Sequence, residues 1–389
     1  MTTAILFCSA CGAMNKSKSA YCIVCHQRLS SEKNYRVRLE SLRSNSSTHP
    51  GYRSSSSAKR GITRRSLLTS LGALTVAVGA VLIGVNVGKW YIAGPTPLYT
   101  YQGHSSINAI AWSPDGRYIA SAFDDGTVQI WNVTDRSNIF LYQGHVQSVE
   151  GVAWSPDSKR LASCSVDTTV QVWNATDGSQ VLTYRGHRSA VLGVAWSSNG
   201  KYIASCSTDN TVQVWDVING NQELTYQGHA GSVAGVAWSS DSKRLASCST
   251  DSTVQVWNAA DGSRIFTYHG SGEAAFLGVA WSPDGKRIAS ASMNFTVQVL
   301  DATDGSSIFA YQGHSNVGFR DLEGWPTRVA WSPDSQHLAS VGADTQVWEA
   351  TNGGGAMTYP GNSGVAWSPD NHRLASSSFD GTVNVWNVS

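Results

Sequence analysis

Short apolar runs separated by turn residues repeat along the chain from residue 98 onward. One unit contains VLGVAWS (191–197), KYIASCS (201–207), TVQVWD (211–216) and QELTY (222–226). Runs of this length, rich in Val, Ile, Thr and Tyr, are typical of β-strands. Between two such runs stands Ser-Pro-Asp-Gly (113–116), a tight-turn sequence in which proline presets φ and glycine closes the turn. The pattern predicts four short strands in each unit.

The unit returns about every 42 residues. SCSVDTTVQVWN at 163–174 recurs as SCSTDNTVQVWD at 205–216 and as SCSTDSTVQVWN at 247–258. No single active site needs one phrase three times, so the repetition indicates a repeat architecture. Each unit contains one tryptophan in an AWS phrase: Trp112, Trp154, Trp196, Trp238, Trp281, Trp331 and Trp367. We therefore predict seven units.

The Gly-His … Trp-Asp signature at this period resembles that of WD-repeat β-propellers. The resemblance implies an all-β fold, a seven-bladed propeller over residues 95–389. The first unit is preceded by an extra strand at 98–101, and the last unit stops after the strand at 383–386. We expect the extra strand to complete the last blade, which would close the ring and leave few free sheet edges.

The same resemblance implies a structural hydrogen-bond network of His, Ser or Thr, Asp and Trp in each blade. The matching residues are His104, Asp125 and Trp131; His145, Asp167 and Trp173; His187, Asp209 and Trp215; and His229, Asp251 and Trp257. The serine is Ser121, Ser163, Ser205 or Ser247, or the serine two residues later where one is present. Ser, His and Asp also form hydrolase triads. Four copies of one network indicate architecture instead, so we predict no catalytic residue and no enzyme.

Later units depart from this pattern. The fifth has Gly270-Ser271 in place of Gly-His, Asn294 in place of Asp and Leu300 in place of Trp. The seventh has Asn362 near the His position. The sixth keeps His314, Asp344 and Trp348 but is one residue short before this Trp. Departures from a repeat are positions where function can reside.

The sixth unit also carries an insertion. His314 stands 17 residues before its AWS tryptophan, whereas the separation is eight or nine in the first four units. The extra residues include Phe319, Arg320 and Trp325, and aromatic and arginine residues in loops are common in binding hot spots. Packing of Trp325 into its own blade is the alternative. We expect the same face to expose Asp124, Glu150, Val166, Leu192, Thr208, Thr250, Met293 and Phe379.

Four of the seven cysteines lie near the N-terminus, as CxxC, ten residues and CxxC. Cys8, Cys11, Cys22 and Cys25 match the ligand set of a structural zinc site, with one Zn²⁺ per chain. Their pattern resembles bacterial zinc-ribbon modules, so residues 1–29 are predicted to be a zinc ribbon. Cys164, Cys206 and Cys248 recur at the repeat period and are predicted to be small buried hydrophobic residues.

Residues 30–65 are basic and Ser-rich, which predicts a flexible linker. Residues 66–88 contain no charge and are long enough to cross a bilayer as one helix. Positive charges precede this span, so the N-terminus is predicted to be cytoplasmic and the propeller extracytoplasmic, in a single-pass protein of the cell membrane. Arg64-Arg65 resembles part of a twin-arginine export signal. Ala80, Gly84 and Gly88 have the small-xxx-small spacing of helix dimers.

Charge separates the two ends of the chain. Residues 1–65 hold twelve Lys and Arg against two Asp and Glu, and the remainder holds sixteen against twenty-five. An acidic propeller argues against nucleic acid as a partner. We therefore predict a non-enzymatic, membrane-anchored scaffold or sensor whose propeller binds proteins or peptides on its top face. The alternatives are an exported propeller enzyme or small-ligand receptor that uses the central channel, and a cytosolic protein in which the apolar span is not an anchor.

Overall fold

The computed structural model describes residues 5–8, 14–16, 35–37, 95–314 and 327–388. Every element in the described residues is a strand. No helix among them is long and apolar enough to cross a membrane. The predicted span at 66–88 and the insertion at 315–326 lie outside the described residues.

The N-terminal strands form a small antiparallel sheet. β1 (Ile5–Cys8) lies between β2 (Met14–Lys16) and β3 (Tyr35–Val37). Cys8 is the last residue of β1, and the other three predicted zinc ligands lie outside the described residues. β3 falls within residues 30–65, where we predicted only flexible linker; its Tyr-Arg-Val sequence pairs with Leu6–Cys8. Tyr and Val are strong strand formers, which accounts for the difference.

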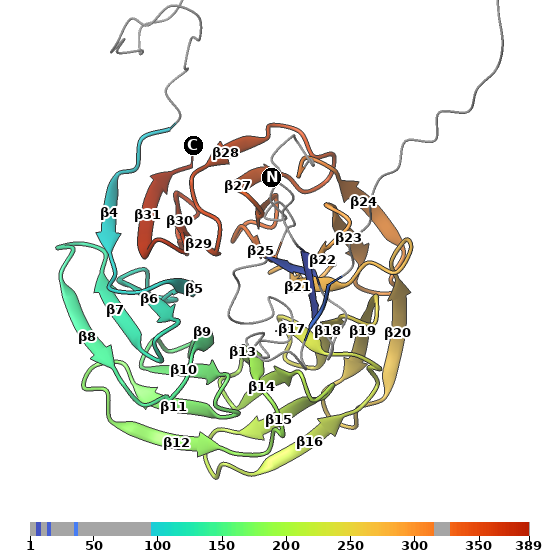
Figure 1. Cartoon of the computed structure of the whole chain (residues 1–389), viewed down its shortest axis with the longest axis horizontal. Helices are drawn as coiled ribbons and strands as arrows, with labels where there is room; N and C mark the ends of the chain where they lie inside the picture. The colour runs from blue at the N-terminus through green and yellow to red at the C-terminus, as the bar shows by residue number, and fades with distance from the viewer. Residues whose placement is uncertain (1–4, 9–13, 17–34, 38–94, 315–326, 389) are drawn as a thin grey trace, which may run out of the picture. The chain divides into compact units, whose positions relative to one another are not determined.

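The remaining strands form seven antiparallel four-stranded sheets around a ring (Figure 1). Blade 1 comprises β5 (Ile107–Trp112), β6 (Tyr118–Phe123), β7 (Val128–Asn132) and β8 (Asn138–Tyr142). Blade 2 comprises β9 (Val149–Trp154), β10 (Arg160–Ser165), β11 (Val170–Asn174) and β12 (Gln180–Tyr184). Blade 3 comprises β13 (Val191–Trp196), β14 (Tyr202–Ser207), β15 (Val212–Asp216) and β16 (Gln222–Tyr226).

The later blades follow the same order from the inside outward. Blade 4 comprises β17 (Val233–Trp238), β18 (Arg244–Ser249), β19 (Thr253–Asn258) and β20 (Arg264–His269). Blade 5 comprises β21 (Phe276–Trp281), β22 (Arg287–Ser292), β23 (Val297–Asp301) and β24 (Ser307–Tyr311). Blade 6 comprises β25 (Arg328–Trp331), β26 (His337–Val341), β27 (Thr345–Glu349) and β28 (Met357–Tyr359).

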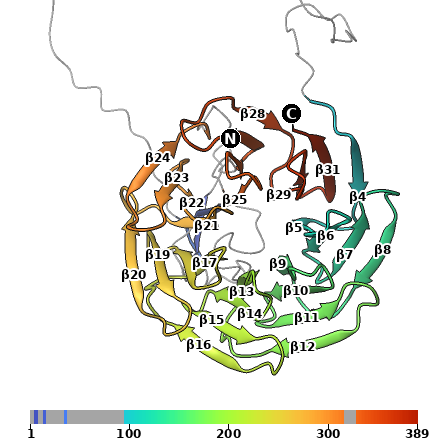
Figure 2. The ribbon, with the colours of Figure 1, turned by 180° about the vertical axis from the view of Figure 1, so that it is seen from behind.

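Blade 7 is completed by the first propeller strand. β29 (Gly364–Trp367), β30 (Arg373–Ser377) and β31 (Thr382–Asn387) are followed in the sheet by β4 (Tyr99–Gln102), with Tyr101 opposite Val383. Figure 2 shows β4 and β31 side by side at the point where the ring closes. The predicted seven blades and the predicted closure are both confirmed.

A side-chain turn motif joins the first two strands of each blade. In blade 1 the hydroxyl of Ser113 donates to Asp115 (2.6 Å) and accepts from the main-chain nitrogen of Tyr118 (2.9 Å). Gly116 follows with φ of 75°, a conformation that favours glycine. The same Ser–Asp pair stands in this turn at Ser155–Asp157 and Ser282–Asp284, among others. The Ser-x-Asp sequence thus fixes each of these hairpins locally.

Neighbouring blades are joined by the AWS tryptophans. Each of these rings lies against the first residue of the second strand of the preceding blade, which is Tyr118, Arg160, Tyr202, Arg244, Arg287, His337 or Arg373. Five of the indoles also donate to an alanine carbonyl of the preceding blade, at 3.1–3.2 Å. The indole nitrogens of Trp112 and Trp281 are buried without a hydrogen-bond partner among the described residues. The junctions of blades 7 and 1 and of blades 4 and 5 therefore each have one bond fewer.

A second set of stacked rings lies further out. Tyr142 on the outer strand of blade 1 stacks on Trp173 of blade 2, with ring centroids 4.4 Å apart. Tyr226 stacks on Trp257 in the same way, at 4.4 Å. Blade 5 has Leu300 in place of this tryptophan, and Tyr268 of blade 4 meets Phe276 edge-on at 6.0 Å instead. The junction of blades 4 and 5 is thus altered in both sets.

Candidate partner-binding face and central channel

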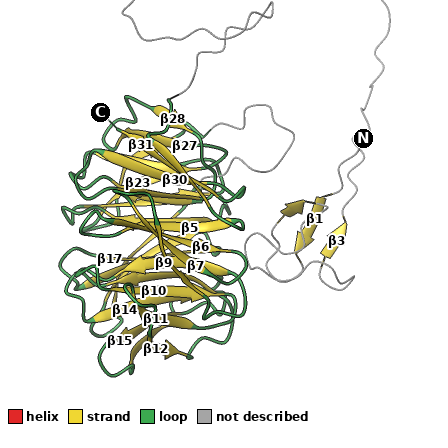
Figure 3. Ribbon diagram, turned by 90° about the vertical axis from the view of Figure 1, so that its left-hand side faces the viewer, coloured by secondary structure: helices red, strands yellow, loops and turns green. Residues whose placement is uncertain are grey.

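The loops that carry the predicted site residues meet at one face of the propeller. His145 stands in the loop between β8 and β9, and its Nδ1 lies 2.9 Å from the Asp167 carboxylate in the loop between β10 and β11. His187 and Asp209 make the same link in blade 3, as do His229 and Asp251 in blade 4. We call the surface formed by these two sets of loops the His face; in the edge-on view of Figure 3 loops gather at both faces of the propeller.

In blades 2, 3 and 4 the histidine belongs to a network of four side chains, together with the aspartate, a serine and a tryptophan. The Nε2 atoms of His145, His187 and His229 lie 2.8 Å from Ser163, Ser205 and Ser247. Those serines accept from the indoles of Trp173, Trp215 and Trp257 at 2.9–3.3 Å. The serine two residues later has another role, since Ser165, Ser207 and Ser249 accept from the main-chain nitrogens of the aspartates. The first serine is therefore the member of the network.

Hydrogen bonds stabilise the charged form of each aspartate in these blades. Burial raises the pKa of Asp167, but hydrogen bonds from His145 and Thr169 outweigh that effect and hold the pKa well below its usual range. Asp209 and Asp251 show the same balance. The histidine and serine side chains are buried and each is already bonded. The arrangement therefore links two loops and a blade core and offers no exposed nucleophile.

Blade 1 has a different arrangement. His104 is exposed by 40%, and its Nε2 contacts Asp125 (3.0 Å) and Thr127 (2.9 Å). The ring stacks on Phe123, with centroids 4.4 Å apart. Phe123 is fully buried and replaces the serine found there in blades 2, 3 and 4. His104 therefore does not bond to Ser121, although Trp131 does so at 3.0 Å.

Blades 5 and 6 have partial networks. In blade 5 Asn294 donates to Ser271 (3.2 Å), and Ser290 bonds to the carbonyl of Gly278 because no tryptophan reaches it. In blade 6 His314 lies 2.7 Å from Ser340, which also accepts from Trp348. His314 and Asp344, both in the described part of the chain, form no ion pair. Burial without a carboxylate partner lowers the pKa of His314 to about 4.

Blade 7 joins its loops through an asparagine. The Asn362 side-chain oxygen accepts from the main-chain nitrogen of Phe379 at 3.2 Å, which links the two loops without a histidine. The Phe379 side chain is 55% exposed on the His face. In this blade the hydrogen bond to Asn362 thus fixes the loop that carries the exposed aromatic side chain of Phe379.

The predicted partner-binding residues divide into three groups. Asp124 and Phe379 are exposed at the His face. Glu150 and Leu192 are buried, so the prediction that they are exposed was wrong: they belong to inner strands β9 and β13, and Ser148 donates to the Glu150 carboxylate at 2.7 Å. Phe319, Arg320 and Trp325 lie outside the described residues.

One exposed residue on this face escaped the sequence analysis. Val146 follows His145 and is 85% exposed. Its main-chain nitrogen donates to Asp167 at 3.2 Å, so the backbone is held in place while the side chain faces solvent. The residue after Gly-His occupies this position in every complete blade. A large apolar residue there, such as Val146, is the sequence feature that would have predicted the exposed side chain.

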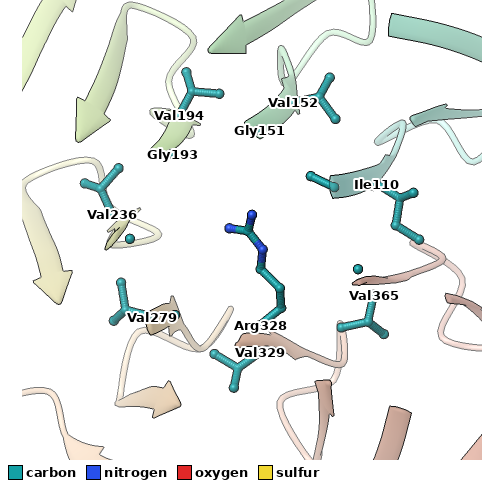
Figure 4. A pocket seen from close by; sticks show the side chains of 14 residues that line it. Ile110, Gly151, Val152, Gly193, Val194, Val236, Val279, Arg328, Val329 and Val365 are labelled. Carbon is teal, nitrogen blue, oxygen red and sulfur yellow. The ribbon is translucent and has the colours of Figure 1, made fainter. Parts of the chain in front are cut away.

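The inner strands surround a central channel of about 170 Å³ (Figure 4). Each blade contributes one Val or Ile and one residue just before it; the latter set is Ala109, Gly151, Gly193, Gly235, Gly278, Arg328 and Gly364. Glycine is required in blades 2 and 3 because a Cβ there would lie 2.9 Å from the sulfur of Cys164 or Cys206. These cysteines and Cys248 are free and fully buried, and burial raises the pKa of Cys248 to about 12. Among the described residues no cluster could hold a metal ion.

The fold is a seven-bladed β-propeller, and parts of the chain match WD40 repeats. The family model "WD domain, G-beta repeat" matches residues 95–132, 136–174, 305–348 and 357–387. The model "IFT122 first beta-propeller" matches residues 165–321. The chain is also 46% identical over 46 residues to the Periodic tryptophan protein 2 homolog of Dictyostelium discoideum. That match covers 12% of this chain and only 5% of the relative.

Proposed function

We propose that this protein is a non-enzymatic scaffold or sensor, anchored in a membrane, whose propeller binds a protein or peptide on the His face. The exposed side chains of Val146 and Phe379 carry this proposal, since both lie on loops held by hydrogen bonds from their main-chain nitrogens. Apolar and aromatic groups on rigid supports are efficient anchors because little conformational entropy is lost on binding. Asp124 adds a charge to the same face.

Phe319, Arg320 and Trp325 are proposed to extend this surface. They stand 5 to 11 residues after His314 in the chain, and His314 bonds to Ser340 as the histidines of blades 2, 3 and 4 bond to their serines. Their residue types are those of interface hot spots. Trp325→Ala in the full-length chain should weaken partner binding without lowering the melting temperature; a drop as large as that of a core tryptophan variant would assign Trp325 to packing.

The N-terminal region is proposed to supply a zinc ribbon and an anchor. Cys8, Cys11, Cys22 and Cys25 have the spacing of a structural Zn²⁺ site, and residues 66–88 have the length and composition of a membrane span. Metal analysis should give one zinc per chain, and Cys8→Ser should lose it as fully as Cys25→Ser. Protease added to spheroplasts should digest the propeller and spare an N-terminal tag, whereas the opposite pattern would reverse the topology.

A matched pair of variants tests the binding face. Phe379 and Ile218 are both exposed apolar residues, at 55% and 86%, but Ile218 lies in the loop between β15 and β16, at the other face. Crosslinking in intact cells should capture a partner with the wild-type chain and with Ile218→Ala. Phe379→Ala should weaken that capture by about 2 kcal/mol, or roughly 30-fold. Equal capture by both variants would remove the His face as the binding surface.

A further inference from the structure

The central channel contains a charged side chain at a position where the other blades have glycine or alanine. Arg328 of blade 6 occupies the position taken by glycine in five blades and by Ala109 in blade 1. Figure 4 shows its side chain extended into the middle of the ring of Val and Ile residues. Among the described residues that line the channel, Arg328 is the only one that is charged. Blade 6 therefore places one cation near the axis of a channel otherwise lined by uncharged residues.

Most of the hydrogen-bond donors of the Arg328 guanidinium are not used by the described residues. Its Nη2 donates to the main-chain oxygen of Glu150, across the channel in blade 2, at 3.0 Å. Within the described part of the chain this is its one hydrogen bond, and it forms no ion pair there. A guanidinium carries five N–H donors in a planar fork. The remaining donors therefore face a channel lined by Val and Ile side chains, from Ile110 around to Val365, and by the main chain of the glycines between them.

The surroundings make this charge costly unless an anion accompanies it. Arg328 is half-buried, so its charge loses part of its hydration, and a partner of opposite charge recovers part of that loss. The electrostatic influence of Arg328 extends to the thiols of Cys164, Cys206 and Cys248, in three successive blades, where it opposes the rise in pKa caused by burial. The cation thus acts on three blades rather than on one neighbour.

We propose that the central channel is a binding site for a carboxylate with a short aliphatic chain, held by the guanidinium of Arg328. A carboxylate fits the planar fork with two parallel hydrogen bonds and carries a single charge that one guanidinium neutralises. The aliphatic part packs against the valines. A phosphate dianion fits less well, because one guanidinium would leave its second charge unpaired. This site is distinct from the His face and does not depend on the function proposed for that face.

Binding of small acids to the full-length chain tests this site. Isobutyrate, isobutyramide and inorganic phosphate are titrated against the protein and followed by ligand-observed NMR. Isobutyrate should bind at least tenfold more tightly than isobutyramide, which has the same shape without the charge, and than phosphate. A tetrapeptide ending in valine, with a free or an amidated C-terminus, distinguishes a peptide terminus from a free acid as the source of the carboxylate. Preference for the free terminus supports a peptide source, and isobutyrate binding alone supports a small acid.

Two variants link any binding to Arg328. Arg328→Gln keeps most of the length of the side chain, and Arg328→Gly restores the residue of five other blades; both should weaken isobutyrate binding at least tenfold. Arg117→Gln, at an exposed arginine outside the channel, should leave it unchanged. Isobutyrate binding that survives Arg328→Gln, or a wild-type chain that binds isobutyrate no better than isobutyramide, would overturn the proposal. In the second case Arg328 serves only to connect blade 6 to blade 2, and the melting temperature of Arg328→Gln would report that connection.

Discussion

Blades 2, 3 and 4 and blades 5 and 6 share a fold but differ in what holds their loops. The first group carries the same four-membered network three times, with distances that agree to within a few tenths of an ångström. Blade 5 keeps the sheet with Leu300 and Asn294 in place of the tryptophan and aspartate, and blade 6 keeps the histidine without its ion pair. The antiparallel sheet therefore does not need the network. The network adds stability and rigidity to the loops of the His face.

The largest difference between the two groups should come from the tryptophan. Trp257 is fully buried, stacks on Tyr226 and donates to Ser247. Trp257→Ala should lower the free energy of unfolding by about 3–5 kcal/mol, measured by urea denaturation. Leu300→Ala in blade 5 removes fewer atoms and no hydrogen bond, so its loss should be smaller. Equal losses would show that the network adds nothing beyond packing.

Mild acid should separate blade 6 from blades 2–4. The pKa of folded His314 is about 4, below the ordinary value near 6.5, so the unfolded chain binds the extra proton first. The free energy of unfolding is therefore unaffected by this histidine above pH 6.5. It falls as the pH drops to 4, by about 3 kcal/mol in total. The aspartates of blades 2–4 have lowered pKa values, so their contribution is lost only below their ordinary pKa near 3.8. Urea melts between pH 7 and 4 should lose this slope in His314→Gln; an unchanged slope would contradict the assignment.

Removal of a loop carboxylate compares blade 4 with blade 5. Asp251 bonds to His229, to Thr253 and to the main-chain nitrogen of Ala230. Asp251→Ala should cost about 2–3 kcal/mol, because hydrogen bonds to a charged group are lost and the buried Nδ1 of His229 keeps only its longer contacts to Thr253 and Gln255, both at 3.3 Å. Asn294→Ala, the matched change in blade 5, removes neutral bonds only and should cost about 1 kcal/mol. In Asp251→Ala, amide exchange should rise in the loop after His229. In Asn294→Ala, it should stay unchanged in the loop after Gly270.

The smallest effect concerns the blade junctions. Trp331 and Trp281 each lie under an arginine at 4.8 Å, but only Trp331 donates to a carbonyl of the preceding blade. Replacement by phenylalanine removes the indole N–H from both. Trp331→Phe should therefore cost about 1 kcal/mol more than Trp281→Phe in thermal or urea melts. A larger loss at Trp281 would mean that its nitrogen has a partner in solution.

The sequence predicted most of the fold because the repeat contains its own strand, turn and network chemistry. The count of AWS tryptophans gave the number of blades, and the unpartnered strand at 98–101 gave the closure. Burial of Glu150 and Leu192 was missed because inner strands are packed on both sides, so strand alternation does not separate buried from exposed positions. The different arrangement of His104 depends on Phe123, whose size decides where the ring can lie. The sequence shows Arg328 as a departure from the repeat, since blade 6 reads Arg-Val-Ala-Trp where other blades read Gly-Val-Ala-Trp. That this position lines the channel follows only from the three-dimensional arrangement of the blades.

The pairing of β4 with β31 also sets an order of folding events. The two strands are separated by almost the whole propeller, so the loop closed by their contact spans some 280 residues. Closing a loop of that length costs roughly 5 kcal/mol of chain entropy by the (3/2)RT ln n relation, and contacts of such sequence separation form slowly. During synthesis β4 emerges first, yet its partner strand emerges last. Throughout that interval β4 is an unpaired strand, and the outer edge of blade 7 is the site where a nascent chain is most open to pairing with another copy.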